Sequence, residues 1–337
     1  MVRVVQIESG TKRRVAVVCE PFLRCLEMAD SVHALAIDSI RKATSLSAVI
    51  QELAVGEELL YDDLYAGRSD WRLLPPIDVA ASPGRLLLAG TGLTHLGSAQ
   101  DRQAMHARGA LESQAQTDSM RMYELGRIGG RPKAGQVGAA PEWFYKGNGT
   151  MVRRPFDALT VPSYAEDGGE EAEVAGVYVI GDDTRPYRVG MCAANEFSDH
   201  RFERRNYLNL AGSKLRECSL GPELLIGGDF KSVSGEVSIV REGNLVWRKT
   251  IHTGEDHMCH SLMNLEHHHF KFARLCIPGD VHVHFYGASA LSFGDGVELQ
   301  DWDSVQIQYE GFGRALHNTI RFETLLADQL VIATPLS

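Results

Sequence analysis

The 337-residue sequence predicts an α+β protein rich in β-strand, in which a small N-terminal module precedes a larger domain. From about residue 141 onward, short apolar runs alternate with Gly, Asp and Asn turns, which is the pattern of successive strands. Near residue 76, Pro75, Pro76 and Pro83 mark a linker, because proline does not fit a central strand. We therefore expect an N-terminal α+β domain at 1–76 and a catalytic domain at 77–337.

The N-terminal module should contain two strands and a helix. The runs "VRVVQI" and "RVAVV" flank the turn "ESGTKR", which predicts a pair of strands. From about Ser31 to Leu53 the apolar residues recur three and four apart, so this segment is expected to be helical.

In the larger domain, "RLLLAGTG" has the pattern of a buried strand and is followed by a polar, Gly-rich, partly helical stretch at 98–140. We interpret this stretch as a mobile insert or lid. The runs "VAGVYVIG", "YRVGMCAA", "EVSIVREG", "NLVWRKT", "DVHVHFYG", "SVQIQYEG" and "HNTIRF" predict further strands. A single helix is expected, at about 258–275.

The composition favours a small-molecule partner. The chain has 44 acidic and 34 basic residues, a formal charge of −10, and no basic stripe interleaved with aromatic residues, which argues against nucleic acid. The six cysteines show no CxxC spacing, so we expect reduced thiols. Without a signal peptide or an 18-residue apolar run, the protein is expected to be soluble and cytoplasmic, with no membrane partner.

The stretch "EEAEVAGVYVIGDD" places Glu171 and Glu173 two residues apart at the start of an apolar run. Side chains in a strand alternate faces, so these two carboxylates should point the same way. They would repel each other unless a cation such as Mg²⁺ or Mn²⁺ lay between them. On this evidence alone, a solvated strand edge is the commoner explanation.

A second strand, "YRVGMCAANEFSDHR", ends in polar residues: Asn195, Glu196 and Ser198. Glu196 would supply a third carboxylate and complete a site for a hard cation with open positions for a substrate. As an alternative, Glu196 would only begin the following helical turn.

Two lysines are candidates for contacts with an anion. Lys214 could hold a substrate carboxylate or stabilise an enolate, although most lone lysines lie at the surface. Lys146 follows three aromatic residues within four positions, and a partly buried lysine must find an anion.

Two other patterns are weak. Gly90 and Gly92 suggest a dinucleotide fingerprint, but the third glycine is missing and no regular βαβ unit follows. His257 and His260, if helical, would lie one turn apart, and His282 and His284 would share a strand face. No zinc-ligand spacing accompanies them, so structural or surface roles are expected.

Taken in order, these segments resemble the fumarylacetoacetate hydrolase family. The resemblance extends over about 74–320 and includes "RLLLAGTGLTH", "PEWFYKGNG", "EEAEVAGVYVIG", "VGMCAANEFS", "SKLRECSLGP", "PGDVHVHFYG" and "YEGFGRALHN". It implies a mixed β-roll or sandwich, a homodimer or higher homo-oligomer, and Mg²⁺ or Mn²⁺ bound by Glu171, Glu173 and Glu196.

The sequence also departs from the family pattern. Glu196 stands where the family has Asp, Ser98 stands where the hydrolases have the water-activating histidine, and Ala288 replaces the threonine of a Gly-Thr-Pro turn. These differences put a hydrolase reaction in doubt. They favour the sugar-acid branch of the family, whose members dehydrate 2-keto-3-deoxy aldonic acids.

The resemblance therefore implies a metal-dependent dehydratase of a 2-keto-3-deoxy sugar acid, with a pentonate giving 2-ketoglutaric semialdehyde. The keto acid would chelate the metal, which makes its C3 proton acidic, and the C4 hydroxyl would then leave. Lys214, with a lowered pKa, is the candidate base or enolate stabiliser, Glu196 also belongs to the catalytic group, and His95 is the candidate acid. The expected substrate-binding residues are Lys146, Ser98, Asn195, Ser198 and Ala288.

Two alternatives remain. One is a metal-dependent hydrolase or decarboxylase that cleaves a carbon–carbon bond in a 2,4-diketo acid, with His95 or His106 as base. The other is a sugar-acid-binding protein without turnover.

Overall fold

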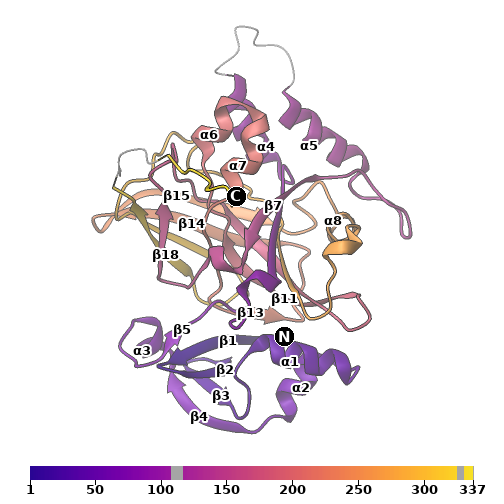
Figure 1. The fold of residues 1–337 in the computed structure, drawn as a ribbon, viewed down its shortest axis with the longest axis vertical. Coiled ribbons are helices and arrows are strands. Elements are labelled where there is room, and N and C mark those ends of the chain that lie inside the picture. Colours follow the sequence, from indigo (N-terminus) through magenta and orange to yellow (C-terminus); the bar gives the residue numbers. More distant parts are fainter. Residues whose placement is uncertain (108–116, 325–329, 337) are drawn as a thin grey trace.

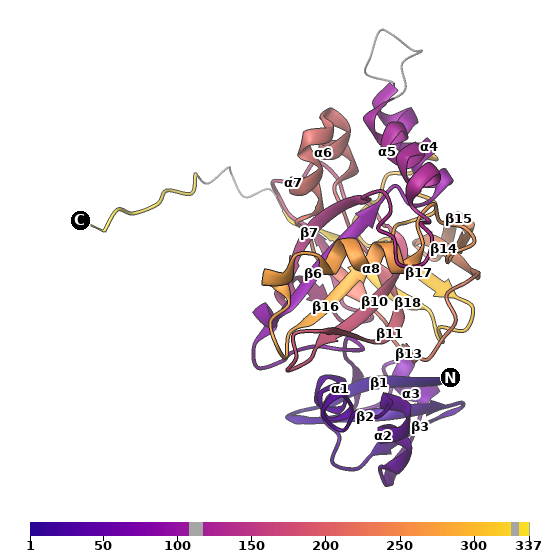
Figure 2. The same ribbon diagram turned by 90° about the vertical axis from the view of Figure 1, so that its right-hand side faces the viewer.

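The computed structural model describes residues 1–107, 117–324 and 330–336 and consists of two β-sheets with helices packed on them (Figure 1). The N-terminal sheet strands lie at one end of the molecule, and helices α4 to α7 lie at the other (Figures 1 and 2). The β-rich α+β fold class predicted from the sequence is confirmed.

The N-terminal segment forms a twisted antiparallel layer with three helices. Its strands are β1 (Val2–Ser9), β2 (Lys12–Cys19), β3 (Phe22–Leu26), β4 (Val55–Leu60) and β5 (Arg72–Leu73), and its helices are α1 (Val32–Arg41), α2 (Leu46–Glu52) and α3 (Tyr61–Tyr65). The prediction of one helix over 31–53 was wrong. Helix α1 ends at Arg41, and Ala43 in the following turn has a positive φ of 50°. Ser45 then caps α2 by accepting a hydrogen bond from Ala48 N.

The N-terminal strands continue into the sheet of the larger part. β1 pairs antiparallel with β13, matching Val2 with Ile226, and the order is β4-β3-β2-β1-β13-β11-β10-β16-β6-β7. The additional strands of this sheet are β6 (Leu86–Gly92), β7 (Glu142–Asn148), β8 (Val152–Arg153), β10 (Ala172–Ile180), β11 (Pro186–Asn195), β12 (Cys218–Leu220), β13 (Leu224–Ile226) and β16 (Val281–Phe285). β6 and β16 run parallel, so the sheet is mixed.

A second sheet packs against the first. Its strands are β9 (Ala158–Val161), β14 (Val233–Arg241), β15 (Asn244–Thr253), β17 (Ser304–Tyr309) and β18 (Leu316–Phe322), in the order β15-β14-β17-β18-β9. Val174 and Ala193 of the first sheet share one hydrophobic cluster with Val237 and Ile307 of the second. This cluster is the core between the sheets.

The helical content of the larger part exceeds the prediction. Besides α8 (Leu262–Phe270), which is shorter than the expected helix at 258–275, there are α4 (Leu96–Ala107), α5 (Asp118–Gly129), α6 (His200–Arg205) and α7 (Leu210–Lys214). α6 and α7 are one-turn to two-turn helices, too short to produce a clear periodic pattern. Helices α4 and α5 fall in the segment predicted to be a lid, a role that stays a prediction.

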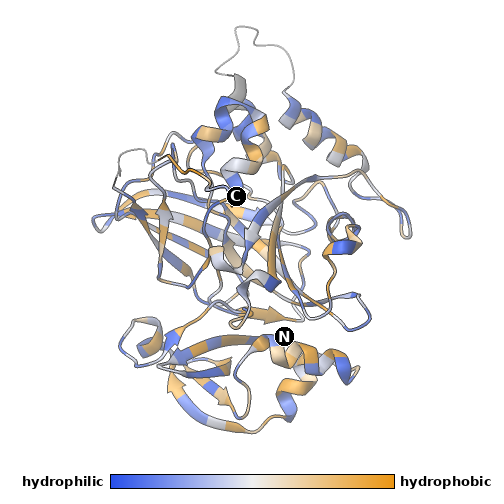
Figure 3. Ribbon diagram, viewed as in Figure 1, coloured by the Kyte–Doolittle hydropathy of each residue, from blue (hydrophilic) through white to orange (hydrophobic). Residues whose placement is uncertain are grey.

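Hydrophobic residues concentrate along the strands, whereas α6 is largely hydrophilic (Figure 3). β10 is buried over its whole length. All six cysteines are free thiols. Among the described residues, no helix is both long enough and apolar enough to cross a membrane.

Candidate metal centre

The β10–β11 hairpin brings three acidic residues together. Glu173 pairs with Ala194 across the hairpin, and the amide of Glu196 donates to the carbonyl of Glu171 at 3.0 Å. The two carboxylates that precede the core in β10 therefore lie beside the carboxylate that follows β11. Alternation along the strand places Glu171 and Glu173 on one face, as the sequence predicted.

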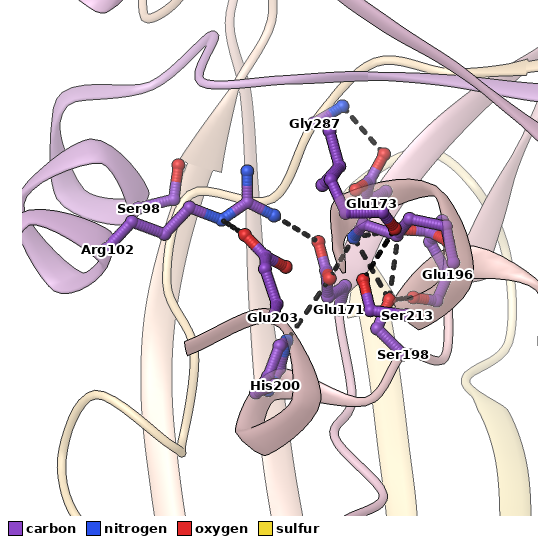
Figure 4. Close-up of polar contacts among 12 residues, drawn as sticks. Ser98, Arg102, Glu171, Glu173, Glu196, Ser198, His200, Glu203, Ser213 and Gly287 are labelled. Carbon is purple, nitrogen blue, oxygen red and sulfur yellow. Dashed lines mark hydrogen bonds and ion pairs between the residues drawn. The ribbon is translucent and has the colours of Figure 1, made fainter. Parts of the chain in front are cut away.

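The three side chains form a compact group that could hold a metal ion. Carboxylate oxygens of Glu171, Glu173 and Glu196 lie within 4.8 Å of one another, and the residues are 3%, 2% and 0% exposed. A solvated strand edge, the alternative interpretation of the sequence, does not apply, because burial removes these carboxylates from water. Figure 4 shows them converging on one region.

Lys214 lies within this group. Its Nζ donates to Glu196 Oε2 at 2.6 Å, to Ser198 Oγ at 3.0 Å and to Glu171 Oε1. Burial alone would lower the pKa of Lys214, but the adjacent Glu171 and Glu196 raise it above its ordinary value. In the metal-free cluster, two carboxylates therefore outweigh the loss of solvent. The lowered pKa expected from the sequence was for a lysine beside a bound cation, and it stays a prediction.

Lys146 forms an ion pair with Glu196, which supplies the anion that the sequence analysis expected. It is fully buried, and its Nζ lies 2.6 Å from Glu196 Oε1 while donating to the carbonyls of Phe197 at 2.6 Å and Lys214 at 3.0 Å. The ammonium group thus donates to two carbonyls and forms an ion pair with Glu196. This arrangement fixes Glu196 in place.

Of the three acids, Glu173 has the negative charge that the surrounding residues neutralise least. One oxygen accepts the amide of Gly287 at 2.6 Å, and no ion pair is recorded for it among the described residues. Burial, followed by repulsion from Glu196 and Glu171, raises the pKa of Glu173 well above its usual range. A cation at this point would relieve both effects.

The charges of the surrounding cluster also fit a divalent cation. The cluster contains five buried glutamates and three buried basic residues: Glu142, Glu171, Glu173, Glu196, Glu203, Arg102, Lys146 and Lys214. With all eight ionised and the histidines neutral, the cluster has a net formal charge of −2. Carboxylate oxygens are the ligands that Mg²⁺ and Mn²⁺ prefer. The donor set therefore fits the predicted ions.

The other residues expected to bind substrate lie close to the acids. Asn195 Oδ1 accepts the amide of Glu171 at 3.2 Å, and its buried Nδ2 has no hydrogen-bond partner within the part of the chain that the structure describes. Ser198 Oγ donates to the carbonyl of Glu196 at 3.0 Å. Ala288 is buried and directly follows Gly287, the donor to Glu173.

His95 and Ser98 lie at the start of α4. His95 is buried, with Nδ1 2.8 Å from Thr94 Oγ1 and Nε2 3.0 Å from Thr253 Oγ1. Burial lowers the pKa of His95 to about 3, so the ring is neutral. Ser98 Oγ donates to the carbonyl of His95 at 3.3 Å. The side chain of His106 lies outside the described residues.

Four charged residues at the site were missed in the sequence: Arg102, Glu142, His200 and Glu203. Arg102 from α4 is 2% exposed and lies among Glu142, Glu171 and Glu203. His200 Nε2 is 3.2 Å from Glu171 Oε1, and Tyr207 donates to Glu142 at 2.5 Å. Glu142 stands directly before the aromatic run "WFY", which could have indicated a buried carboxylate. Arg102 lies in a polar stretch, and no pattern around it indicates burial.

The histidines of α8 and β16 contact one another and neighbouring side chains, and their expected structural or surface roles stay a prediction. Trp143 Nε1 donates to His269 Nδ1 at 3.1 Å, and His269 Nε2 lies 3.0 Å from His282 Nδ1. His269 also stacks on His284. The pKa values of His269, His282 and His284 are lowered, and burial is the largest cause for each. His257 and His260 belong to a turn region rather than a helix.

No protein-family model and no curated protein matches the sequence, whereas solved structures do. An apo form of 2-keto-3-deoxy-D-arabinonate dehydratase has a TM-score of 0.69 at 18% identity, covering 96% of this chain and 100% of that chain. The same dehydratase complexed with magnesium and 2,5-dioxopentanoate also gives 0.69 at 18% identity, covering 95% and 99%.

This chain has the fold of that dehydratase. A 5-carboxymethyl-2-hydroxymuconate delta-isomerase from Mycobacterium smegmatis is less similar, with a TM-score of 0.57 at 16% identity over 95% of this chain and 100% of that chain. The resemblance predicted from the sequence is confirmed at the level of the dehydratase fold, which also contains isomerases.

Proposed function

We propose that the protein is a metal-dependent dehydratase of a 2-keto-3-deoxy sugar acid, with a pentonate as the preferred substrate and 2-ketoglutaric semialdehyde as the product. The observation that supports it most is the buried group of Glu171, Glu173 and Glu196 next to Lys214. The fold is shared with a dehydratase whose structure was solved with magnesium and 2,5-dioxopentanoate.

Glu171, Glu173 and Glu196 would hold Mg²⁺ or Mn²⁺. A cation bound there would polarise the carboxylate and keto groups of the substrate and so favour loss of the C3 proton. The cluster lies in a buried environment in which such electrostatic effects are stronger than in water.

Lys214 acts as the electrostatic stabiliser in this proposal. Its ammonium group already donates to Glu171 and Glu196, so it is held beside the position of the ion. This position suits the stabilisation of negative charge on the keto oxygen, and the removal of the C3 proton is the alternative role of Lys214. Lys146 positions Glu196, since it is held by two backbone carbonyls and pairs with this carboxylate.

The roles of the remaining candidates are less direct. His95 is neutral, so it would have to take up a proton, such as the one lost from C3, before it could deliver one to the departing C4 hydroxyl. One of its hydrogen bonds, to Thr94 or Thr253, would also have to be exchanged for the substrate. Asn195 has an unused buried amide, and Ser198 contacts Lys214, which makes both suitable for contacts with the polar end of a sugar acid.

Turnover of synthetic substrates tests the proposal. Chelator-treated protein should be inactive, and Mg²⁺ or Mn²⁺ should restore formation of the semialdehyde from a 2-keto-3-deoxypentonate. Lys214→Ala should lower kcat by about 10²-fold or more with a smaller effect on KM. Cleavage of a 2,4-diketo acid with no reaction of the pentonate would identify a hydrolase instead, and calorimetric binding without any product would identify a binding protein.

A further inference from the structure

Arg102 connects helix α4 to the candidate metal centre. It lies in the second half of α4 and is 2% exposed, which is rare for arginine. Its guanidinium contacts three carboxylates from three elements: Glu142 Oε2 of β7 at 3.0 Å, Glu203 Oε1 of α6 at 3.3 Å, and Glu171 Oε2 at 3.7 Å (Figure 4 shows the last two).

Arg102 shares the orientation of Glu171 with Lys214 and His200. Lys214 and His200 contact Oε1 of Glu171, whereas Arg102 faces Oε2. Both oxygens of this carboxylate therefore have a defined partner. Without Arg102, Oε2 would face the carboxylates of Glu142 and Glu203 with no intervening cation, and the side chain of Glu171 would turn away from them.

The backbone leaves little room for another arrangement. A Cβ on Gly92 would lie 1.7 Å from Glu142 Oε2 and 2.8 Å from Arg102 Nη1, so the glycine allows this ion pair to pass close to β6. A Cβ on Gly97, in the same helix as Arg102, would lie 2.4 Å from the carbonyl of Ser289. The ion pair of Arg102 and Glu142 is thus closely packed against β6, and helix α4 is closely packed against the backbone of Ser289.

From this geometry we infer that Arg102 is a positioning residue for metal binding: its planar guanidinium orients Glu171 toward the ion shared with Glu173 and Glu196. The inference rests on the metal site of the proposed function. It adds a residue of α4 that acts through its contact with Glu171. Partners that orient metal ligands typically contribute 10-fold to 100-fold to affinity.

An Arg→Lys substitution separates geometry from charge. Lysine keeps the positive charge, but its compact ammonium cannot reach three carboxylates in a fixed plane. A purely electrostatic role predicts unchanged cation affinity in Arg102→Lys. A purely structural role predicts a lower melting temperature without a specific loss of cation affinity.

The experiment is calorimetric titration of Mn²⁺ into chelator-treated full-length protein, with thermal melts of the metal-free samples. Arg102→Lys should raise the Kd for Mn²⁺ about 10-fold or more. Arg241→Lys is the matched control, because Arg241 forms a two-bond ion pair with the buried Asp303 in the second sheet. It should lower the melting temperature and leave the Kd unchanged.

A Kd within about twofold of wild type in Arg102→Lys overturns the inference. If that variant does not fold, Glu203→Gln takes its place, since it removes an anchor of Arg102 without touching a metal ligand, and it should raise the Kd about threefold. An unchanged Kd there also overturns the inference. Because the readout is Mn²⁺ binding, a protein that shows these effects without turnover supports the inference and contradicts only the dehydratase.

Discussion

At the scale of single residues, the central feature is a buried excess of negative charge. Lys214 and Lys146 compensate the charges of Glu171 and Glu196, whereas Glu173 accepts a hydrogen bond from the backbone amide of Gly287 and has no ion pair among the described residues. Because the pKa of Glu173 is raised on folding, its contribution to stability is present at low pH and is lost as the pH rises through its folded-state pKa. Ionised Glu173 therefore destabilises the metal-free protein.

Glu173→Gln should consequently stabilise the metal-free protein while abolishing metal binding. In chelator and above the folded-state pKa of Glu173, the neutral amide should raise the free energy of unfolding by roughly 1–3 kcal/mol, because a buried unpaired charge is removed. Thermal melts with and without Mn²⁺ measure both effects: wild type should shift upward with Mn²⁺ and the variant should not.

The exposed Glu236, paired with Arg248, offers a control on the second sheet. Glu236→Gln should retain the full Mn²⁺ shift. A metal-free Glu173→Gln protein that is less stable than wild type would contradict the proposed charge imbalance.

At the scale of elements, the turn after β16 presents a backbone donor to the metal centre. Gly287 has φ 99°, and a Cβ there would lie 2.1 Å from Thr94 Oγ1 and 2.8 Å from the carbonyl of Thr91. The turn can approach Glu173 because this residue is a glycine.

Gly287→Ala should therefore weaken Mn²⁺ binding about 10-fold and destabilise the protein by about 1–3 kcal/mol. Gly311→Ala is the matched control, since Gly311 also has a positive φ, of 81°, but a Cβ would meet nothing within 4 Å. The control should lose stability only. Equal Mn²⁺ affinity in both variants, measured by calorimetry, would show that the turn does not position Glu173.

The histidines on and around β16 predict a pH dependence of stability. The pKa values of His284 and His95 are each lowered to about 3, and burial is the largest cause. A depressed folded-state pKa contributes stability that is present above the unfolded pKa, near 6.5, and is lost as the pH falls toward the folded value. These two imidazoles should thus contribute less stability at pH 5 than at pH 7.

Urea unfolding at these two pH values tests this element. Replacing His284 by Asn should reduce the loss between them by about 2 kcal/mol, because one titrating group is removed. The exposed His252 provides the control, and His252→Gln should keep the wild-type dependence. An unaltered pH dependence in His284→Asn would show that this imidazole does not titrate on unfolding.

At the scale of the whole molecule, the sequence predicted the features that depend on local patterns. The alternation of Glu171 and Glu173, and the acid that follows the next strand, were sufficient to predict that the three carboxylates meet. The reason is that a two-stranded hairpin fixes the register of the residues that carry them. The mixed β-rich architecture followed from the spacing of apolar runs and turns.

The features that depend on contacts between distant segments were not predictable. Arg102 reaches Glu171 from a helix 69 positions earlier in the chain, and no local pattern signals this approach. The raised pKa of Lys214 likewise depends on two partners from different segments. The single helix expected at 31–53 failed for a local reason, since Ser45 starts a new helix inside an apolar repeat.

The most direct test of the account is a crystal structure with Mn²⁺ and pyruvate, measured at a wavelength where manganese scatters anomalously. Pyruvate copies the chelating end of a 2-keto acid. The account predicts one anomalous peak at bonding distance, about 2.0–2.2 Å, from oxygens of Glu171, Glu173 and Glu196, with pyruvate oxygens completing the coordination. A peak elsewhere, or none in a crystal that contains manganese in solution, would contradict it.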